Sequence, residues 1–173
     1  NRKNVGLFEQ LDGAEIKNLK IENAKIINKV YFDSKYGTGI LAGESINSKI
    51  SNIMVTGEII SSSKTGLLVG KMKLNKDCNS LENSVVIGNV LWENFSTENN
   101  GDETVGSIAG EITGRNIKMS DCIIISNLDC KFLDDGIIGG VCGTGSVEIK
   151  NSYVFAKMPE PENMYELFGK IVG

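Results

Sequence analysis

The sequence repeats a unit of two parts, and its clearest copy runs from Ile138 to Phe155. The first part of this copy is a glycine, three small or apolar residues and a second glycine, from Gly139 to Gly143. Further copies of the first part lie at 39–43, 66–70, 106–110 and 169–173, with a degenerate copy at 6–8. Repetition at an interval of about 30 residues is typical of solenoids, propellers and arrays, in which one unit stacks on the next.

The second part of the unit centres on an asparagine or an aspartate, at Asn18, Asn52, Asn83, Asp121 and Asn151. The residue three positions further on is mostly β-branched, the residue five positions on is small, and the residue seven positions on is mostly apolar. Offsets of two place these residues on one face of a strand. The first copy slips by one position at Ile26, which predicts a β-bulge. Because Asn and Asp bond nearby backbone and tolerate tight turns, we expect this column to stack as a hydrogen-bonded ladder.

The density of glycine argues against a helical repeat, since glycine costs about 1 kcal/mol in a helix interior. Val, Ile, Thr and Tyr fill the runs between the turns, as they do in strands. We therefore predict an all-β fold, a right-handed parallel β-helix (solenoid) of about five coils plus a partial sixth, with a β-sandwich as the alternative. Two columns of side chains would fill its interior: Leu41, Leu68, Ile108, Val141 and Ile171, and Ala42, Val69, Ala109, Cys142 and Val172.

The segment Val5-Gly6-Leu7-Phe8, followed by Ala-Glu-Ile-Lys-Asn-Leu-Lys-Ile-Glu-Asn at 14–23, resembles the opening coil of the repeats called GLUG. The segments 65–70 and 150–156 are similar to the same pattern, whereas the long third coil and the four cysteines depart from it. GLUG repeats occur in bacterial surface proteins and in the N-terminal region of Gram-positive zinc metalloproteases of the immunoglobulin-A-cleaving type. The resemblance implies a β-helical module of a secreted or cell-wall-attached protein. It carries over no catalytic residue, because the protease motif His-Glu-x-x-His is absent.

The composition limits the classes of partner that the chain can bind. A net charge of −4 and only two arginines, Arg2 and Arg115, argue against nucleic acid, which requires a clustered basic surface. No apolar run approaches about 18 residues, so we expect no membrane insertion, and no signal peptide is visible. We expect residues 1–173 to form a single β-helix repeat domain excised from a larger secreted protein, because 169–173 begin a sixth coil without its asparagine part.

The chain contains no histidine, which excludes a Ser-His-Asp triad, a Cys-His pair and a His-based zinc site. We therefore expect no catalytic residue, no metal site and no cofactor. Some β-helical enzymes that act on carbohydrates use acidic and basic side chains in a groove, and the candidates here would be Arg115, Asp121, Asp129, Asp134 and Asp135. Against this reading, Asp134-Asp135-Gly136 predicts a turn, and Asp121 belongs to the asparagine column.

The four cysteines are Cys78, Cys122, Cys130 and Cys142, and they form no C-x-x-C pair. We expect buried, reduced thiols that act as small hydrophobic side chains. A disulfide is the alternative for a secreted protein, although four cysteines are few for a disulfide scaffold.

The third coil, residues 65–103, is the longest because it carries insertions at 71–80 and 91–103. Insertions in repeat proteins map to loops and often to the binding face, and large aromatic side chains anchor interfaces. We therefore predict Trp92, Phe95 and Glu93 as partner-binding residues, for a protein substrate, a host surface ligand or other domains of the parent chain. The alternative is that Trp92 folds back onto the flank of the coil and has a packing role.

Three functions are compatible with these observations. The first is a noncatalytic module of a secreted or cell-surface bacterial zinc metalloprotease, which acts as a rigid spacer or docks a substrate or partner. The second is an adhesin stalk that binds host or matrix ligands, and the third is a β-helical carbohydrate-active enzyme. A His-Glu-x-x-His motif downstream of the chain would favour the first function, and a wall-anchor tail without that motif would favour the second.

Overall fold

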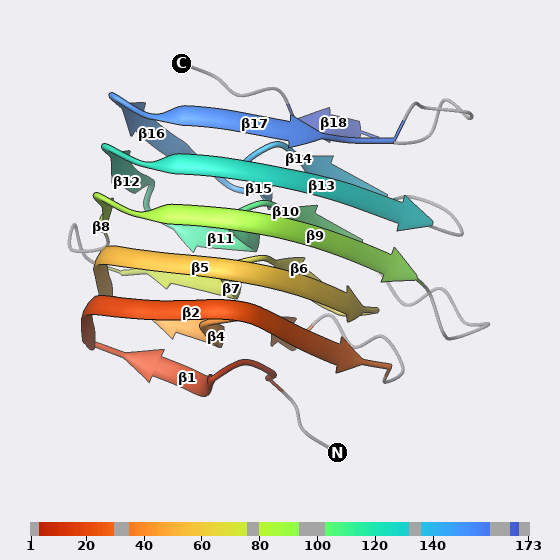
Figure 1. Cartoon of the computed structure of the whole chain (residues 1–173), viewed down its shortest axis with the longest axis horizontal. Helices are drawn as coiled ribbons and strands as arrows, with labels where there is room; N and C mark the ends of the chain where they lie inside the picture. Colours follow the sequence, from red (N-terminus) through yellow and green to blue (C-terminus); the bar gives the residue numbers. More distant parts are fainter. Residues whose placement is uncertain are drawn as a thin grey trace.

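The computed structural model describes residues 4–29, 35–75, 80–93, 103–131, 136–159 and 167–169. Every regular element in these residues is a β-strand, and all pairs of neighbouring strands are parallel. The all-β fold predicted from the sequence is therefore confirmed, and the strands form three parallel sheets (Figure 1).

The three sheets are named here by the length of their strands. The short sheet contains β3 (Gly37–Thr38), β6 (Lys64–Gly66), β10 (Glu103–Gly106), β14 (Gly136–Gly139) and β18 (Leu167–Gly169). The middle sheet contains β1 (Phe8–Asp12), β4 (Ala42–Ile46), β7 (Val69–Leu74), β11 (Ala109–Gly114) and β15 (Cys142–Thr144). The long sheet contains β2 (Glu15–Asn28), β5 (Lys49–Ser61), β8 (Ser80–Glu82), β9 (Val85–Glu93), β12 (Ile117–Ser120), β13 (Ile123–Lys131), β16 (Val147–Lys150) and β17 (Tyr153–Lys157).

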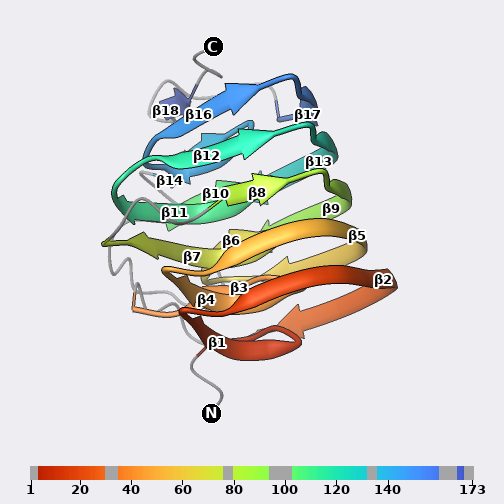
Figure 2. The ribbon, with the colours of Figure 1, turned by 90° about the vertical axis from the view of Figure 1, so that its left-hand side faces the viewer.

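From the second repeat to the fifth, the chain passes through the short, the middle and the long sheet in that order. In the third to fifth repeats the long-sheet part is divided into two strands, which are β8 and β9, β12 and β13, and β16 and β17. The first repeat holds β1 and β2, the fifth ends with β17, and β18 follows it. Each strand pairs with its equivalent in the next repeat, so that Val55 pairs with Val86, Val86 with Ile124, and Ile124 with Val154. The repeats therefore follow one another up the stack in sequence order, from β1 and β2 at one end to β17 and β18 at the other (Figure 2).

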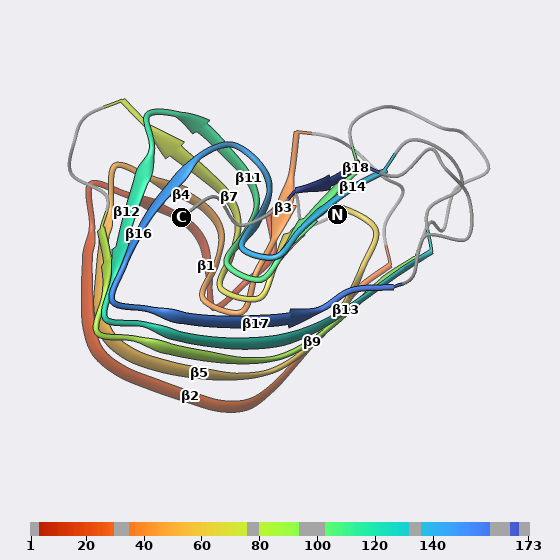
Figure 3. The ribbon, with the colours of Figure 1, turned by 90° about the horizontal axis from the view of Figure 1, so that it is seen from above.

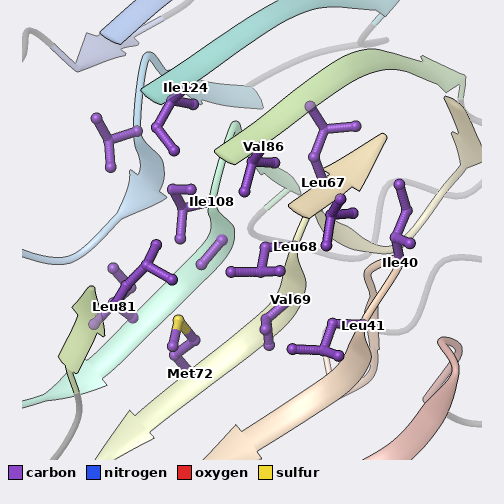
Figure 4. Packing of buried hydrophobic residues seen from close by; sticks show 14 of the residues in the cluster. Ile40, Leu41, Leu67, Leu68, Val69, Met72, Leu81, Val86, Ile108 and Ile124 are labelled. Atoms are coloured by element: carbon purple, nitrogen blue, oxygen red, sulfur yellow. The ribbon is translucent and has the colours of Figure 1, made fainter. Parts of the chain in front are cut away.

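The predicted columns lie in the interior of this stack. Leu41 and Leu68 are fully buried, and Ile108 and Val141 are 1% and 5% exposed. The second column is buried at Ala42, Val69 and Ala109 and half-buried at Cys142, whereas Ile171 and Val172 lie outside the described residues. Side chains from the middle and long sheets pack against these columns (Figure 4). The alignment of the repeats in the sequence therefore identifies these interior positions.

The paired glycines allow the short and middle sheets to meet backbone to backbone. Seen along the stack, the chain runs toward the long sheet in the short strand and turns back in the middle strand (Figure 3). A Cβ on Gly70 would lie 2.2 Å from the backbone nitrogen of Thr38, one repeat earlier, and a Cβ on Gly110 would lie 2.4 Å from that of Thr65. Because no side chain fits at such distances, the second glycine of the motif is required by contact and not by turn geometry.

An ion pair spans the contact between the same two sheets. The ammonium of Lys64 in β6 bonds the carboxylate of Glu111 in β11, and their side chains are only 5% and 19% exposed. Charges removed from water in this way are tolerated only as a pair, because an unpaired buried charge costs several kcal/mol. Removal of either partner alone would therefore leave the other charge buried and unpaired.

The asparagine column forms the bend in each long strand. Asn18, Asn52, Asn83, Asp121 and Asn151 all have positive φ, between 46° and 56°. The side-chain amide of Asn52 donates to Oδ1 of Asn18 at 2.6 Å, and that of Asn83 donates to Oδ1 of Asn52 at 3.4 Å. The predicted ladder is therefore confirmed for these three asparagines. The predicted bulge is confirmed as well, since the register of β2 on β5 shifts between Ile21 and Ala24.

We expect Ile124→Asp to lower the free energy of unfolding by at least about 3 kcal/mol, because the carboxylate would be buried without a partner. Ile124 is fully buried, whereas Ile27, also in the long sheet, is 54% exposed. Ile27→Asp is therefore the control and should change stability by less than about 1 kcal/mol. Urea unfolding followed by circular dichroism measures both, and equal losses in the two variants would contradict the assigned faces.

We expect Asn52→Ala to lower the free energy of unfolding by about 2 kcal/mol, because alanine is strained at positive φ and the ladder loses its middle member. Asn52→Gly should lose about half as much, since glycine adopts this backbone freely and only the side-chain bonds disappear. The difference between the two variants isolates the backbone contribution. If alanine and glycine were equivalent at this position, the bend would not depend on its left-handed conformation.

Candidate interaction surface

The residues named for an enzymatic alternative are spread over the repeat. Asp121 lies at the bend before β13, where its backbone N–H donates to the carbonyl oxygen of Lys150 at 3.1 Å. Asp129 lies near the end of β13, eight residues further along an extended strand, which is roughly 26 Å away. Hydrolases hold their two carboxylates about 5–9.5 Å apart, so these two cannot act as such a pair. Arg115 lies beyond the other end of β12, and Asp134 and Asp135 lie outside the described residues.

Trp92 lies in a strand and not in the loop that the sequence suggested, because β9 extends to Glu93. The Trp92 side chain has no exposed surface, and its indole N–H donates to the carbonyl oxygen of Ser63 at 2.8 Å. In the sheet, Trp92 pairs with Ser61 on one side and Cys130 on the other. The indole is therefore packed inside the third repeat, which is the packing role that the sequence left as the alternative.

The other two predicted partner-binding residues are placed less fully. Glu93 is half-buried at the end of β9, and Phe95 lies outside the described residues. A binding role for Glu93 and Phe95 stays a prediction. A partner could reach the indole of Trp92 only if the third repeat opened.

Cys122 and Cys142 are free thiols, the first buried and the second half-buried. Cys130 is buried in β13, and Cys78 lies outside the described residues. The expected burial is confirmed for Cys122 and Cys130, whereas Cys142 is only half-buried, and the reduced state of the thiols stays a prediction. Burial raises the pKa of the Cys122 thiol, and burial raises the pKa of Cys142 to about 11.

Cys122 occupies the place of a serine in the neighbouring repeats. The hydroxyls of Ser84 and Ser152 donate to the carbonyl oxygen two residues earlier, at 2.6 Å and 2.8 Å. The Cys122 thiol makes the same contact with the carbonyl oxygen of Ser120 at 3.0 Å. The thiol therefore substitutes for a hydroxyl that supports the bend, and its surroundings give it a structural role.

We expect alkylation of Cys142 by iodoacetamide to be slow in the folded chain and to accelerate as the pH rises toward 11. Only the thiolate reacts, and a pKa of about 11 in place of the ordinary 9.0 lowers the thiolate fraction about 100-fold at neutral pH. Peptide mass spectrometry gives the labelling rate, and the urea-unfolded chain is the control. Labelling of folded and unfolded Cys142 at equal rates at neutral pH would contradict this assignment.

The outer face of the long sheet carries a cluster of exposed apolar side chains. Ile123 and Ile125 of β13 are 45% and 37% exposed, and Tyr153 and Phe155 of β17 are 58% and 54% exposed. Half-buried residues of β5 and β9 extend the cluster. We call the set the apolar face; it consists of Met54, Val85, Ile87, Ile123, Ile125, Tyr153 and Phe155. A contiguous surface of this kind marks an interaction site more often than solitary exposed apolar residues do.

The strand register arranges the apolar face in two columns. The first column runs Met54, Val85, Ile123 and Tyr153, and the second runs Thr56, Ile87, Ile125 and Phe155. Exposed polar residues border both sides of the last three repeats: Asn83, Asp121 and Asn151 before the columns, and Asn89, Asn127 and Lys157 after them. An apolar centre with a polar rim is the arrangement of protein interfaces.

This apolar face was not predicted from the sequence. The missed signal is the run of three apolar residues at 85–87, 123–125 and 153–155. A strand with one face in water alternates apolar and polar residues. An unbroken apolar run instead predicts that both faces of the strand pack against other groups.

A hollow of about 370 Å³ opens beside the first repeat, where no described strand precedes β1 and β2. It is lined mainly by apolar residues: Val5, Leu7, Ile21, Ala24, Ile26, Ile27 and Ile40. Within the described residues, no group of three or more His, Cys, Asp and Glu side chains could hold a metal ion. The described part of the chain also lacks any helix of the length and apolar character needed to cross a membrane.

Two curated proteins similar to this chain are both named Immunoglobulin A1 protease, from Streptococcus pneumoniae. The protein from strain ATCC BAA-255 / R6 is 28% identical over 173 residues, and the second is 27% identical over 173 residues. Each comparison covers 96% of this chain but only 8% of the relative, so the chain spans a small part of the length of the curated relatives it matches. No protein-family model matches the chain. No solved structure matches it significantly.

Proposed function

We propose that this chain is a noncatalytic module of a secreted or cell-surface bacterial metalloprotease, in which it acts as a rigid spacer or as a docking surface for a substrate or partner. The observation that carries the proposal is the distant similarity to immunoglobulin A1 protease, which extends over nearly the whole chain. The similar segment is a small fraction of those proteases, as expected for one module among several.

We further infer that the three parallel sheets are the faces of a right-handed parallel β-helix built from GLUG-type repeats. Parallel strands joined by crossovers within one sheet are right-handed in about 98% of cases. Repeats that contact mainly their neighbours, through a continuous core, make an extended and stiff body. Such a body suits a spacer, because its length is set by the number of repeats.

A noncatalytic role fits the chemistry of the described residues. Asp121 and Asp129 lie too far apart to act together, and the backbone of Asp121 forms a bend with positive φ. The zinc of a metalloprotease does not fit this chain, because the chain has no histidine and the described residues have no cluster of other ligands. Zinc and the hydrolytic residues would therefore lie elsewhere in the parent protein.

We expect a parent protease lacking residues 1–173 to hydrolyse a short peptide substrate normally but to cleave intact immunoglobulin A1 with a raised KM. The physical reason is that a docking surface contributes binding energy only to a substrate large enough to reach it. The matched point variants are Ile124→Asp, which disrupts the repeat, and Ile27→Asp, which does not. Kinetics with both substrates separate docking from chemistry.

The outcomes of this experiment separate the candidate functions. Loss of peptide hydrolysis in the deletion variant would show that the segment takes part in catalysis and would refute the proposal. Normal kinetics with both substrates would leave only the spacer role. A parent that binds a host surface but hydrolyses neither substrate would identify an adhesin stalk instead.

A further inference from the structure

Nothing in the described residues covers the apolar face, which lies on the outer side of the curved long sheet (Figure 3). It lies on the broad side of the stack formed by β5, β9, β13 and β17 (Figure 1). Its aromatic and aliphatic side chains have the composition of the inner face of a β-sandwich, where two sheets pack about 10 Å apart. The apolar face of one sheet can be covered by the apolar face of another sheet, and a second copy of this chain supplies one.

We infer that the apolar face binds a second copy of this chain, so that two long sheets pack face to face in a twofold symmetric dimer. The inference goes beyond the proposed function and does not depend on which parent protein carries the chain. The twofold axis would run along the stack, between the two columns of the apolar face. The first column of one copy would then contact the second column of the other copy, and the reverse.

This arrangement places apolar residues on apolar residues in each of the last three repeats. The register of the sheet puts Val85, Ile123 and Tyr153 in one column and Ile87, Ile125 and Phe155 in the other. Across the axis, Val85 would meet Ile87, Ile123 would meet Ile125, and Tyr153 would meet Phe155. The two aromatic residues would pack at the same height, where such pairs add to the energy of area burial.

The polar rim is compatible with the same axis. The residues two positions before the first column would meet those two positions after the second column, which pairs Asp121 with Asn127 and Asn151 with Lys157. In the third repeat Asn83 would meet Asn89. No facing pair in these three repeats joins two like charges, whereas like charges across an interface cost several kcal/mol.

The area of the face suits a dimer of ordinary size. Two exposed aromatics, two exposed isoleucines and three half-buried apolar side chains present on the order of 500 Å². With the polar rim, the surface approaches the roughly 800 Å² per partner that a standard interface buries. The face is therefore large enough for a second copy.

The first experiment measures the mass of the complete 173-residue chain in solution. Light scattering or sedimentation equilibrium across the micromolar range should show a species of twice the 18.7 kDa monomer mass. Ile123→Asp should raise the dimer dissociation constant at least about 100-fold, because each copy would bury an unpaired carboxylate. Ile27→Asp is the control, since Ile27 is as exposed as Phe155 but lies outside the apolar face, and it should leave the dimer intact.

A mixing experiment tests the pairing itself. Ile123→Asp and Ile125→Lys should each give a monomer when studied alone, with circular dichroism that matches the unmodified chain. When the two variants are mixed, the carboxylate of one would face the ammonium of the other, and the two remaining isoleucines would face each other. A heterodimer should therefore reappear in the mixture, and added salt should weaken it.

Several results would overturn the inference. A monomer at every concentration would do so, as would a dimer that withstands Ile123→Asp. A mixture of the two folded variants that stays monomeric would refute the pairing across the axis. If the face were protected from solvent only in a longer natural protein, and the chain alone were monomeric, the occupant would be another segment of that protein and not a second copy.

Discussion

The fold depends on a contact between two backbones that only glycine permits. At Gly70 and Gly110 a Cβ would lie 2.2 Å and 2.4 Å from backbone nitrogens of the preceding repeat. This approach lets the chain double back within every repeat, so that the residues between the glycines, Leu68 and Ile108 among them, reach the interior of the stack. The long strand then crosses the open side of the core. Loss of the contact would separate the short and middle sheets and expose the Lys64–Glu111 ion pair.

The sequence predicted the parts of the fold that repeat with a fixed offset. Equivalent residues such as Val86 and Ile124 lie beside each other in parallel register, so a position that is apolar in every copy is an interior position. The bend at each asparagine could also be predicted, because few other residues accept positive φ. The glycine contact was not predicted, since it joins different repeats and its partners, such as Thr38, have no distinctive identity.

The candidate site was predicted less well, for two physical reasons. An insertion was read as a loop at Trp92, but the strand continues through it and carries the indole inside, where Ser63 accepts its N–H. The apolar face was hidden because each of its residues is a good strand former, and strand propensity does not say which face a side chain occupies. The sequence shows this face only at 123–125 and 153–155, where apolar residues do not alternate with polar ones as they do in a strand with one face in water.

The parallel stacking of the repeats sets how the molecule would respond to mechanical tension. Its first and last described repeats lie at opposite ends of the stack, and the hydrogen bonds between repeats run along the line that joins those ends (Figure 1). A force applied between the two ends would therefore break the hydrogen bonds between one pair of repeats at a time. It would not load all of these bonds together in shear. The chain would lengthen by peeling away single repeats from an end while the remaining stack kept its core.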